Sequence, residues 1–252
     1  MALRRVVRAV APAGLRVAVA RARRAWRDAG LLGSKPRLAA RPVPTPGAAF
    51  PFEVIAVVQA IRGTAFLEGK RANIRLSAAL LDGAVVAPGE ILSFWRLVGR
   101  PSAAAGFAIG RSIRGGIVGG DVGGGLCQVS GILYEAGLRA GLAVAERYPH
   151  SRDLYAEADR FTPLGLDATV VWPYKDLRLL NPHPVPVRFG LAVRDDGIVA
   201  TVSAPLALPP ATLVIGRTDH NDRRAVRVVR RLGDGREELI SDDVYPVLAA
   251  GR

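Results

Sequence analysis

Three consecutive glycines, Gly123–Gly125, stand directly before a stretch of helical pattern, GGGLCQVSGILYEAGLRAGL. Apolar residues recur there at three- and four-residue intervals, which predicts a helix from Cys127 to about Arg139. Gly141 suits the position just beyond its end. Glycine permits a positive φ and the close approach of another chain. The helix is therefore expected to begin at a tight turn that a second backbone or a substrate can approach closely.

The rest of the chain divides into a helical part and a strand-rich part. Before the glycines, the pattern of RANIRLSAALL is helical, and residues 106–125 suit loops and a hairpin. After Gly141 the period changes to two, which predicts a series of strands: LAVAERY, DATVVW, LRLLN, VPVRFGLAV and GIVATVSA. RAVRVVRRL and DGREELI predict a hairpin that turns at Asp234-Gly235. We therefore expect an α+β fold in which the central helix packs on a mostly antiparallel sheet.

Charge and proline mark off the N-terminal part of the chain. Most of the net charge of +13 lies in residues 1–41, which contain eleven basic residues and one acidic residue. We interpret residues 1–35 as a basic amphipathic arm, and residues 36–51, with five prolines, as a linker. Residues 52–252 then form the main domain, with its core motifs in 73–181 and a β-rich C-terminal extension. Because this domain is nearly neutral, nucleic-acid binding is not expected.

The arm resembles neither a secretory signal nor a membrane-spanning helix. Arg8 and Arg16 interrupt its apolar run, which falls short of the roughly 18–20 residues that a spanning helix needs. This favours a cytoplasmic location or a peripheral one at the inner membrane face. A basic amphipathic helix suits contact with anionic lipid, and a solvated charged helix is the alternative.

Cys127 is the sole cysteine, which excludes an intrachain disulfide and any zinc site that needs two thiolates. At the first turn of a helix, the positive end of the dipole lowers the pKa of a thiol. Backbone amides there can stabilise an oxyanion, each contributing about 3 kcal/mol, and Gln128 and Ser130 add side-chain donors. These features favour a cysteine nucleophile. The alternative is a cysteine that only packs in the core.

A nucleophilic thiol needs a base, and His150 is the best placed of the three histidines. It follows Cys127 by one predicted helix and one predicted strand, which together return the chain toward the start of the helix. His183 lies between prolines and His220 lies in a polar turn.

An acid is then expected to orient the imidazole of His150. Asp167, at the start of the predicted strand DATVVW, is our first candidate, and Asp153 and Asp176 are competitors.

Several of these segments together resemble the VanW family, named for an accessory protein of vancomycin-resistance clusters. The similar segments are PGEILSF, GGGLCQVSGILYEAGLRAGL, ERYPHS, GLDATV and KDLRLLN. The matched motif positions are Cys127, Gln128 and Ser130 in the Gly-Cys-Gln motif, His150 and Ser151 in the His-Ser pair, and Asp167 in the Asp-Ala pair. Gly131 and Ile132 depart from the family, which usually has threonines there.

The resemblance implies a bacterial cell-envelope role related to glycopeptide resistance, and for some members peptidoglycan cross-linking in the manner of an L,D-transpeptidase. We therefore expect a cysteine-dependent acyl transferase acting on a peptidoglycan peptide or precursor, without a metal or organic cofactor. Its expected catalytic residues are Cys127, His150 and Asp167, and its expected oxyanion- and substrate-binding residues are Gly124, Gly125, Gln128, Ser130 and Ser151. The alternative is a non-catalytic module that binds a cell-wall fragment or a partner protein.

Overall fold

A computed structural model describes residues 12–29, 37–39, 50–62, 66–114, 117–153, 160–194 and 197–247. The first eleven residues of the predicted arm and most of the predicted linker lie outside these ranges. The helices are α2 (Ala13–Ala29), α3 (Leu67–Leu81), α4 (Phe94–Val98), the short 3-10 helix η1 (Ala103–Ala105) and α5 (Leu126–Arg139). None of the helices in these ranges is long and apolar enough to cross a membrane.

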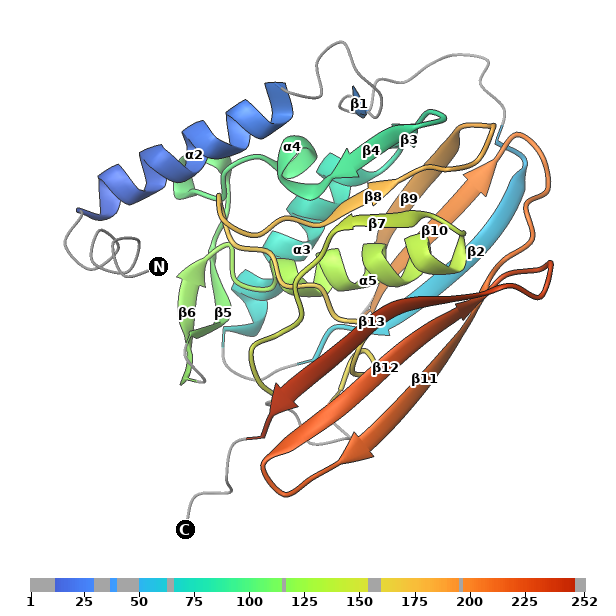
Figure 1. Ribbon diagram of the computed structural model, residues 1–252. Helices are drawn as coiled ribbons and strands as arrows, with labels where there is room; N and C mark the ends of the chain where they lie inside the picture. Colours follow the sequence, from blue (N-terminus) through green and yellow to red (C-terminus); the bar gives the residue numbers. More distant parts are fainter. Residues whose placement is uncertain are drawn as a thin grey trace.

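The strands form four small sheets, shown in Figure 1. One contains β1 (Arg37–Leu38), β4 (Glu90–Ser93), β8 (Arg178–Leu180) and β7 (Ala143–Glu146). The second contains β2 (Phe52–Ala60), β10 (Gly197–Ala204), β9 (Val187–Arg194) and β3 (Val85–Val86). The others contain β11 (Thr212–Asp219), β12 (Arg223–Arg231) and β13 (Glu237–Pro246), and β5 (Ile109–Arg114) with β6 (Ile117–Val122). All these pairings are antiparallel except that of β1 with β4.

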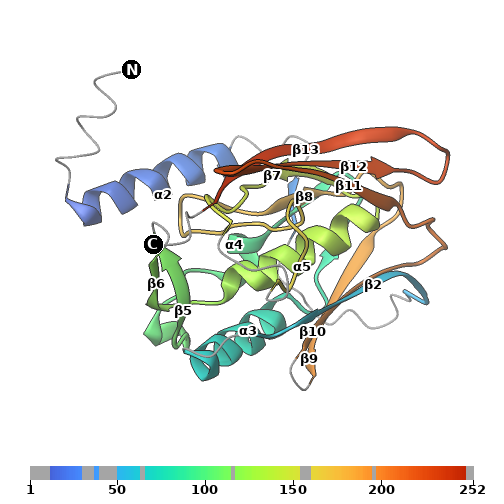
Figure 2. The same cartoon turned by 90° about the horizontal axis from the view of Figure 1, so that it is seen from below.

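Helix α5 lies in the middle of the molecule, as Figures 1 and 2 show. It packs against β2 and β10 on one side and contacts β7 and β11 on the other. Every residue from Leu126 to Leu138 is buried except Cys127. The prediction of an α+β fold built around this helix is confirmed, and Gly141 follows the helix with a φ of 82°.

The glycines before α5 are needed for a close crossing of two backbones. A Cβ atom on Gly124 would lie 2.1 Å from the carbonyl oxygen of Gly110 in β5, and the converse distance is 2.3 Å. Gly125 caps the helix with a φ of 103°, a conformation that other L residues rarely adopt. The turn thus places the start of α5 directly against β5.

The prediction of a strand at DATVVW is wrong. Residues 167–170 have no regular structure, and Val171 forms only an isolated bridge with Lys175. The segment runs along α5, and two of its backbone oxygens accept from that helix: the Ser130 hydroxyl donates to Ala168 O at 2.6 Å, and the Cys127 thiol lies 3.8 Å from Val170 O. Side chains of α5 thus occupy backbone groups that a sheet partner would otherwise bind.

The C-terminal hairpin turns at Asp234-Gly235 as predicted, and β11 adds a third strand that the sequence reading did not include. Near the other end of the chain, α2 is fixed by buried Arg24, which donates to Pro173 O at 2.9 Å and to Asp176 at 2.7 Å. Within the predicted linker, β1 pairs with β4. The proposed domain boundaries stay a prediction.

Candidate active site

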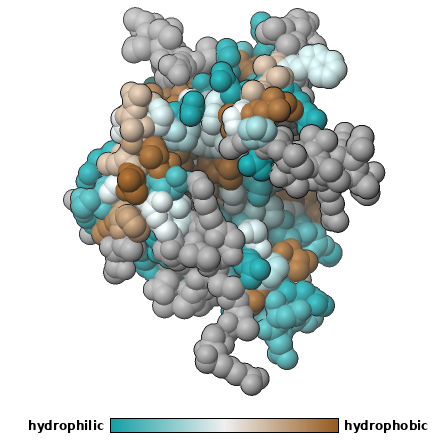
Figure 3. All heavy atoms as spheres, turned by 90° about the vertical axis from the view of Figure 1, so that its left-hand side faces the viewer, coloured by the Kyte–Doolittle hydropathy of each residue, from teal (hydrophilic) through white to brown (hydrophobic). Residues whose placement is uncertain are grey.

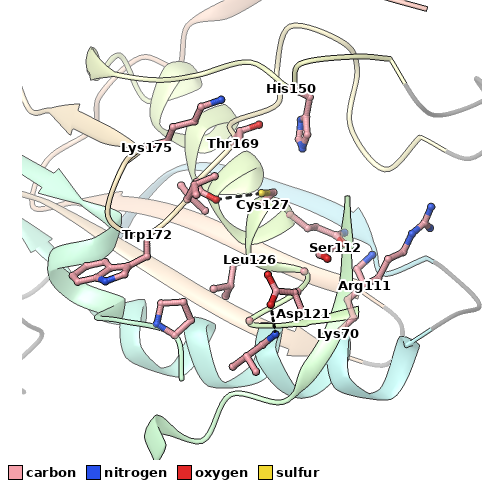
Figure 4. A pocket seen from close by; sticks show the side chains of 18 of the residues that line it. Lys70, Arg111, Ser112, Asp121, Leu126, Cys127, His150, Thr169, Trp172 and Lys175 are labelled. Carbon is pink, nitrogen blue, oxygen red and sulfur yellow. Dashed lines mark hydrogen bonds between the residues drawn. The ribbon is translucent and has the colours of Figure 1, made fainter. Parts of the chain in front are cut away.

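Cys127 lines a cleft of about 760 Å³. The first turn of α5 places its thiol there, partly exposed, while the neighbouring residues of the helix are buried. The cleft opens between α5, the β5–β6 hairpin and the segment 169–175, and Figure 4 shows Cys127 at its centre. Figure 3 views the molecule from the side of α2, β5 and β6 and shows a hollow bordered by hydrophilic and hydrophobic side chains.

His150 approaches Cys127 from the opposite wall of the cleft. Its imidazole points toward the thiol in Figure 4, and each side chain shifts the pKa of the other. The Nδ1 atom of His150 lies 2.6 Å from Oδ2 of Asp167, and the backbone amide of His150 donates to the same oxygen at 2.6 Å. This arrangement fixes the ring and leaves Nε2 for the thiol. The structure therefore brings together the three predicted catalytic residues.

Two residues that the sequence reading did not single out hold Asp167 in place. Arg147, whose side chain is almost wholly buried, donates to Oδ1 of Asp167 at 3.0 Å and to its backbone oxygen at 2.8 Å. The buried hydroxyl of Tyr245 donates to the same Oδ1 at 2.6 Å. Arg147 also forms an ion pair with Asp243. Arg147 lies in the segment ERYPHS, which also contains His150. Tyr245 lies in β13, and no motif in the sequence around it indicates a role at the site.

This network favours a charged pair at the site. Burial by itself raises the pKa of the Cys127 thiol, but the hydrogen bond and the charge of His150 outweigh it and hold the pKa below its usual value. Burial likewise disfavours the imidazolium, yet the hydrogen bonds to Asp167 and Cys127 raise the pKa of His150 to about 10. The same contacts with His150, and the charge of Arg147, hold the pKa of Asp167 well below its usual range. These shifts favour the charged forms of all three side chains over what burial alone would allow: thiolate, imidazolium and carboxylate.

The expected binding residues occupy different positions around the thiol. Gly124, Gly125, Gln128 and Ser151 line the cleft. The side-chain amide of buried Gln128 donates to Ala60 O at 2.8 Å, so this donor is already used. Ser130 does not line the cleft, because its hydroxyl points into the core toward Ala168.

The backbone at the start of α5 offers a donor beside the nucleophile. The amides of Leu126 and Gln128 donate to Gly123 O and Gly125 O, at 3.4 and 3.0 Å. Within the described ranges, no backbone oxygen accepts from the intervening amide of Cys127. A free amide at a helix N-terminus is suited to bind a negative charge.

The other two histidines lie away from the cleft. His183 contacts Ala140 O at 2.8 Å, at the far end of α5, and the backbone amide of His220 closes the β11–β12 turn. The competing acids are also engaged elsewhere. Asp153 pairs with Arg160 and Arg224, and Asp176 binds Arg24. In the part of the chain that the structure describes, no group of three His, Cys, Asp or Glu side chains is arranged to hold a metal ion.

Comparison with known proteins agrees with this arrangement of motifs. A family model described as "VanW like protein" matches residues 69–203. The uncharacterized protein YoaR of Bacillus subtilis is 40% identical over 115 residues, which are 46% of this chain and 36% of that protein. The vancomycin B-type resistance protein VanW of Enterococcus faecalis is 30% identical over 139 residues, 55% of this chain and 50% of that protein. The chain thus spans half or less of these relatives, and no solved structure matches it significantly.

Proposed function

The chain belongs to the VanW family, and from this premise we propose that it is a cysteine-dependent acyl transferase acting on peptidoglycan peptides. The observation that carries the proposal is the position of His150 in the cleft, where its imidazole points toward the Cys127 thiol and is held by Asp167 at 2.6 Å. Nucleophile, base and orienting acid in hydrogen-bonded series are the arrangement on which covalent acyl transfer depends. The family's link to glycopeptide resistance supports a cell-wall peptide as the acyl donor.

In the first step, the Cys127 thiolate attacks the carbonyl carbon of a peptide bond and forms a carbon–sulfur bond. The oxyanion of the tetrahedral intermediate is stabilised by the amide of Cys127 at the N-terminus of α5. As the intermediate collapses, the carbon–nitrogen bond breaks and the imidazolium of His150 gives its proton to the leaving amine. A thioester on Cys127 remains, and the imidazole is neutral.

In the second step, an acceptor amine attacks the thioester while His150 removes its proton. A new amide forms, the thiolate leaves, and the thiolate–imidazolium pair is restored. Asp167 keeps its charge throughout and stabilises the imidazolium, while Arg147 and Tyr245 hold Asp167. No group outside this chain and its two substrates is needed to balance the reaction.

Incubation with a tetrapeptide stem fragment and an amine acceptor tests the proposal. Intact-mass spectrometry should detect a protein adduct that carries the acyl group and is absent from Cys127→Ala, and cross-linked product should form only with the wild type. Folding of the variant is checked by circular dichroism. Equal product formation by Cys127→Ala would overturn the proposal and leave the non-catalytic binding module as the better account.

We also propose that α2 contacts an anionic membrane surface. Its inner face is fixed by Arg24, while Leu15, Val19 and Trp26 on the opposite face are 55%, 41% and 82% exposed. A tryptophan and aliphatic side chains beside arginines suit the interface of anionic lipid. Sedimentation with phosphatidylglycerol vesicles should carry the protein down and should weaken in Trp26→Ser. Equal sedimentation with phosphatidylcholine vesicles would contradict this contact.

A further inference from the structure

Lys70 is a buried cation on the wall of the cleft. It belongs to α3, is 6% exposed, and lines the cleft together with Cys127. A Cβ atom on Gly125 would come within 2.7 Å of its Cγ atom, so the stem of Lys70 packs against the residue that caps α5. Its ammonium group is thereby held close to the N-terminus of the helix that carries the nucleophile.

Among the residues that the structure describes, Lys70 has no acidic partner. Its ammonium donates to Arg62 O at 2.7 Å and lies 5.5 Å from the centre of the Phe161 ring. No carboxylate within the described ranges forms an ion pair with it, and the charge of the Arg111 guanidinium repels it. Burial and this repulsion lower the pKa of Lys70 to about 8. An unpaired buried charge is costly, and proteins normally provide a partner for it.

The remainder of the cleft is also rich in positive charge. Arg111 comes from β5, while Arg152 and Lys175 line other parts of the wall. Asp121 is the one carboxylate among the described residues of the lining. In Figure 4, Lys70 and Arg111 lie together on one side of Cys127, and Lys175 lies on the other. Positive side chains therefore outnumber negative ones along the described lining.

We infer that Lys70 and Arg111 form a subsite for a carboxylate of the molecule that Cys127 attacks. Binding of that carboxylate would give the Lys70 ammonium a counter-charge and place the neighbouring acyl carbon near the thiol. This inference rests on the proposed function and adds the class of substrate to it: an acyl donor with a free carboxylate, preferred over its neutral amide. Lys70 and Arg111 are specificity residues in this account and take no part in proton transfer.

Alkylation of Cys127 by a charged and a neutral reagent tests the subsite. Iodoacetate and iodoacetamide both form a carbon–sulfur bond with the thiolate and release iodide, but only iodoacetate carries a carboxylate. The ratio of the two rates cancels changes in the reactivity of the thiol itself. We expect this ratio to fall about tenfold in Lys70→Met and severalfold in Arg111→Gln, while the rate with iodoacetamide changes little. Arg75→Gln, an exposed position on the same helix, is the matched control and should keep the wild-type ratio.

A ratio that is unchanged in both Lys70→Met and Arg111→Gln would overturn the inference. Failure of the proposed function would give a different result. Cys127 would then react with iodoacetamide in every variant with the pH dependence of an ordinary cysteine. If the thiol reacts too slowly to give a ratio, glutarate can be titrated into Cys127→Ala and followed by tryptophan fluorescence, since Trp172 lines the cleft. A saturable change whose Kd rises at least fivefold when Lys70→Met is added supports the subsite, and an equal Kd refutes it.

Discussion

Asp167 and Asp176 are both buried carboxylates bound by arginine, yet their remaining partners differ in kind. Asp176, fully buried, accepts from Arg24, Arg178 and the hydroxyl of Ser93, and none of these is a histidine or lines the cleft. Asp167 binds Arg147 and Tyr245 in a similar way, but also His150, whose ring reaches the cleft. The burial of an acid therefore does not mark a candidate functional site, whereas a titratable partner that faces a cleft does.

The largest effect is expected at Asp176. Its replacement by alanine removes the fully buried carboxylate that Arg24 and Arg178 share and leaves Glu146 as their common partner. Breaking such a buried pair costs about 3 kcal/mol. Urea denaturation of Asp176→Ala should show this loss in the free energy of unfolding, while the pH profile of the thiol in the folded protein stays as in the wild type. If Asp176→Ala is as stable as the wild type but the pH dependence of Cys127 reactivity changes, Asp176 acts on the thiol as Asp167 is expected to, and the contrast between the two acids is wrong.

Asp167→Asn should act mainly on reactivity. Without the carboxylate, the pKa of His150 falls, the imidazolium no longer stabilises the thiolate, and the pKa of Cys127 rises. We expect the alkylation rate at pH 6 to drop about tenfold, the equivalent of one pKa unit or about 1.4 kcal/mol. Asp176→Asn is the control and should react like the wild type. Equal rates in the two variants would contradict the role of Asp167.

Tyr245→Phe should have a smaller effect on stability. It removes the hydrogen bond to the charged Asp167 and leaves the buried amide of Gly165 without its acceptor, while the phenylalanine ring still fills the buried space, so a loss of about 2 kcal/mol is expected. Thermal unfolding measures the loss. Because Arg147 and His150 still bind Asp167, the pH profile of the thiol should move only slightly; a large shift would make Tyr245 a principal determinant of reactivity.

The smallest effect is expected in how the free energy of unfolding depends on pH in the acid range. The pKa of Asp167 is depressed below its unfolded value of about 3.9, so its contribution is present above that pH and is lost as the pH falls through the folded-state value. The stability difference between wild type and Asp167→Asn should thus shrink below about pH 4, by on the order of 1 kcal/mol per pH unit. Denaturation at several pH values tests this, and a constant difference would contradict it.

The sequence was sufficient for the parts of the molecule that local patterns determine. The spacing of apolar residues predicted α5 within one residue, and the glycines predicted a close backbone approach, here that of Gly110 to Gly124. The family motifs and the chain order predicted which histidine and which acid to place beside Cys127. Each of these features is contained in a short segment or in the order of a few segments.

Long-range partners could not be predicted in the same way. Tyr245 reaches Asp167 from the last strand, 78 residues further along the chain, and nothing in its own segment indicates a partner. The segment DATVVW has the β-branched composition of a strand, but the hydroxyl of Ser130 and the thiol of Cys127 bind its backbone instead. Tertiary contacts decided both cases, and neither leaves a periodic signal in the sequence.

The pH dependence of Cys127 alkylation, compared between wild type and His150→Ala, tests the thiolate–imidazolium pair most directly. Iodoacetamide is the reagent, so the carboxylate subsite does not enter. The account predicts an apparent thiol pKa well below the roughly 8.5 of free cysteine in the wild type, and a clear rise when His150 is lost. An ordinary or raised pKa that is the same in both proteins would contradict it and would make Cys127 a packing residue of α5.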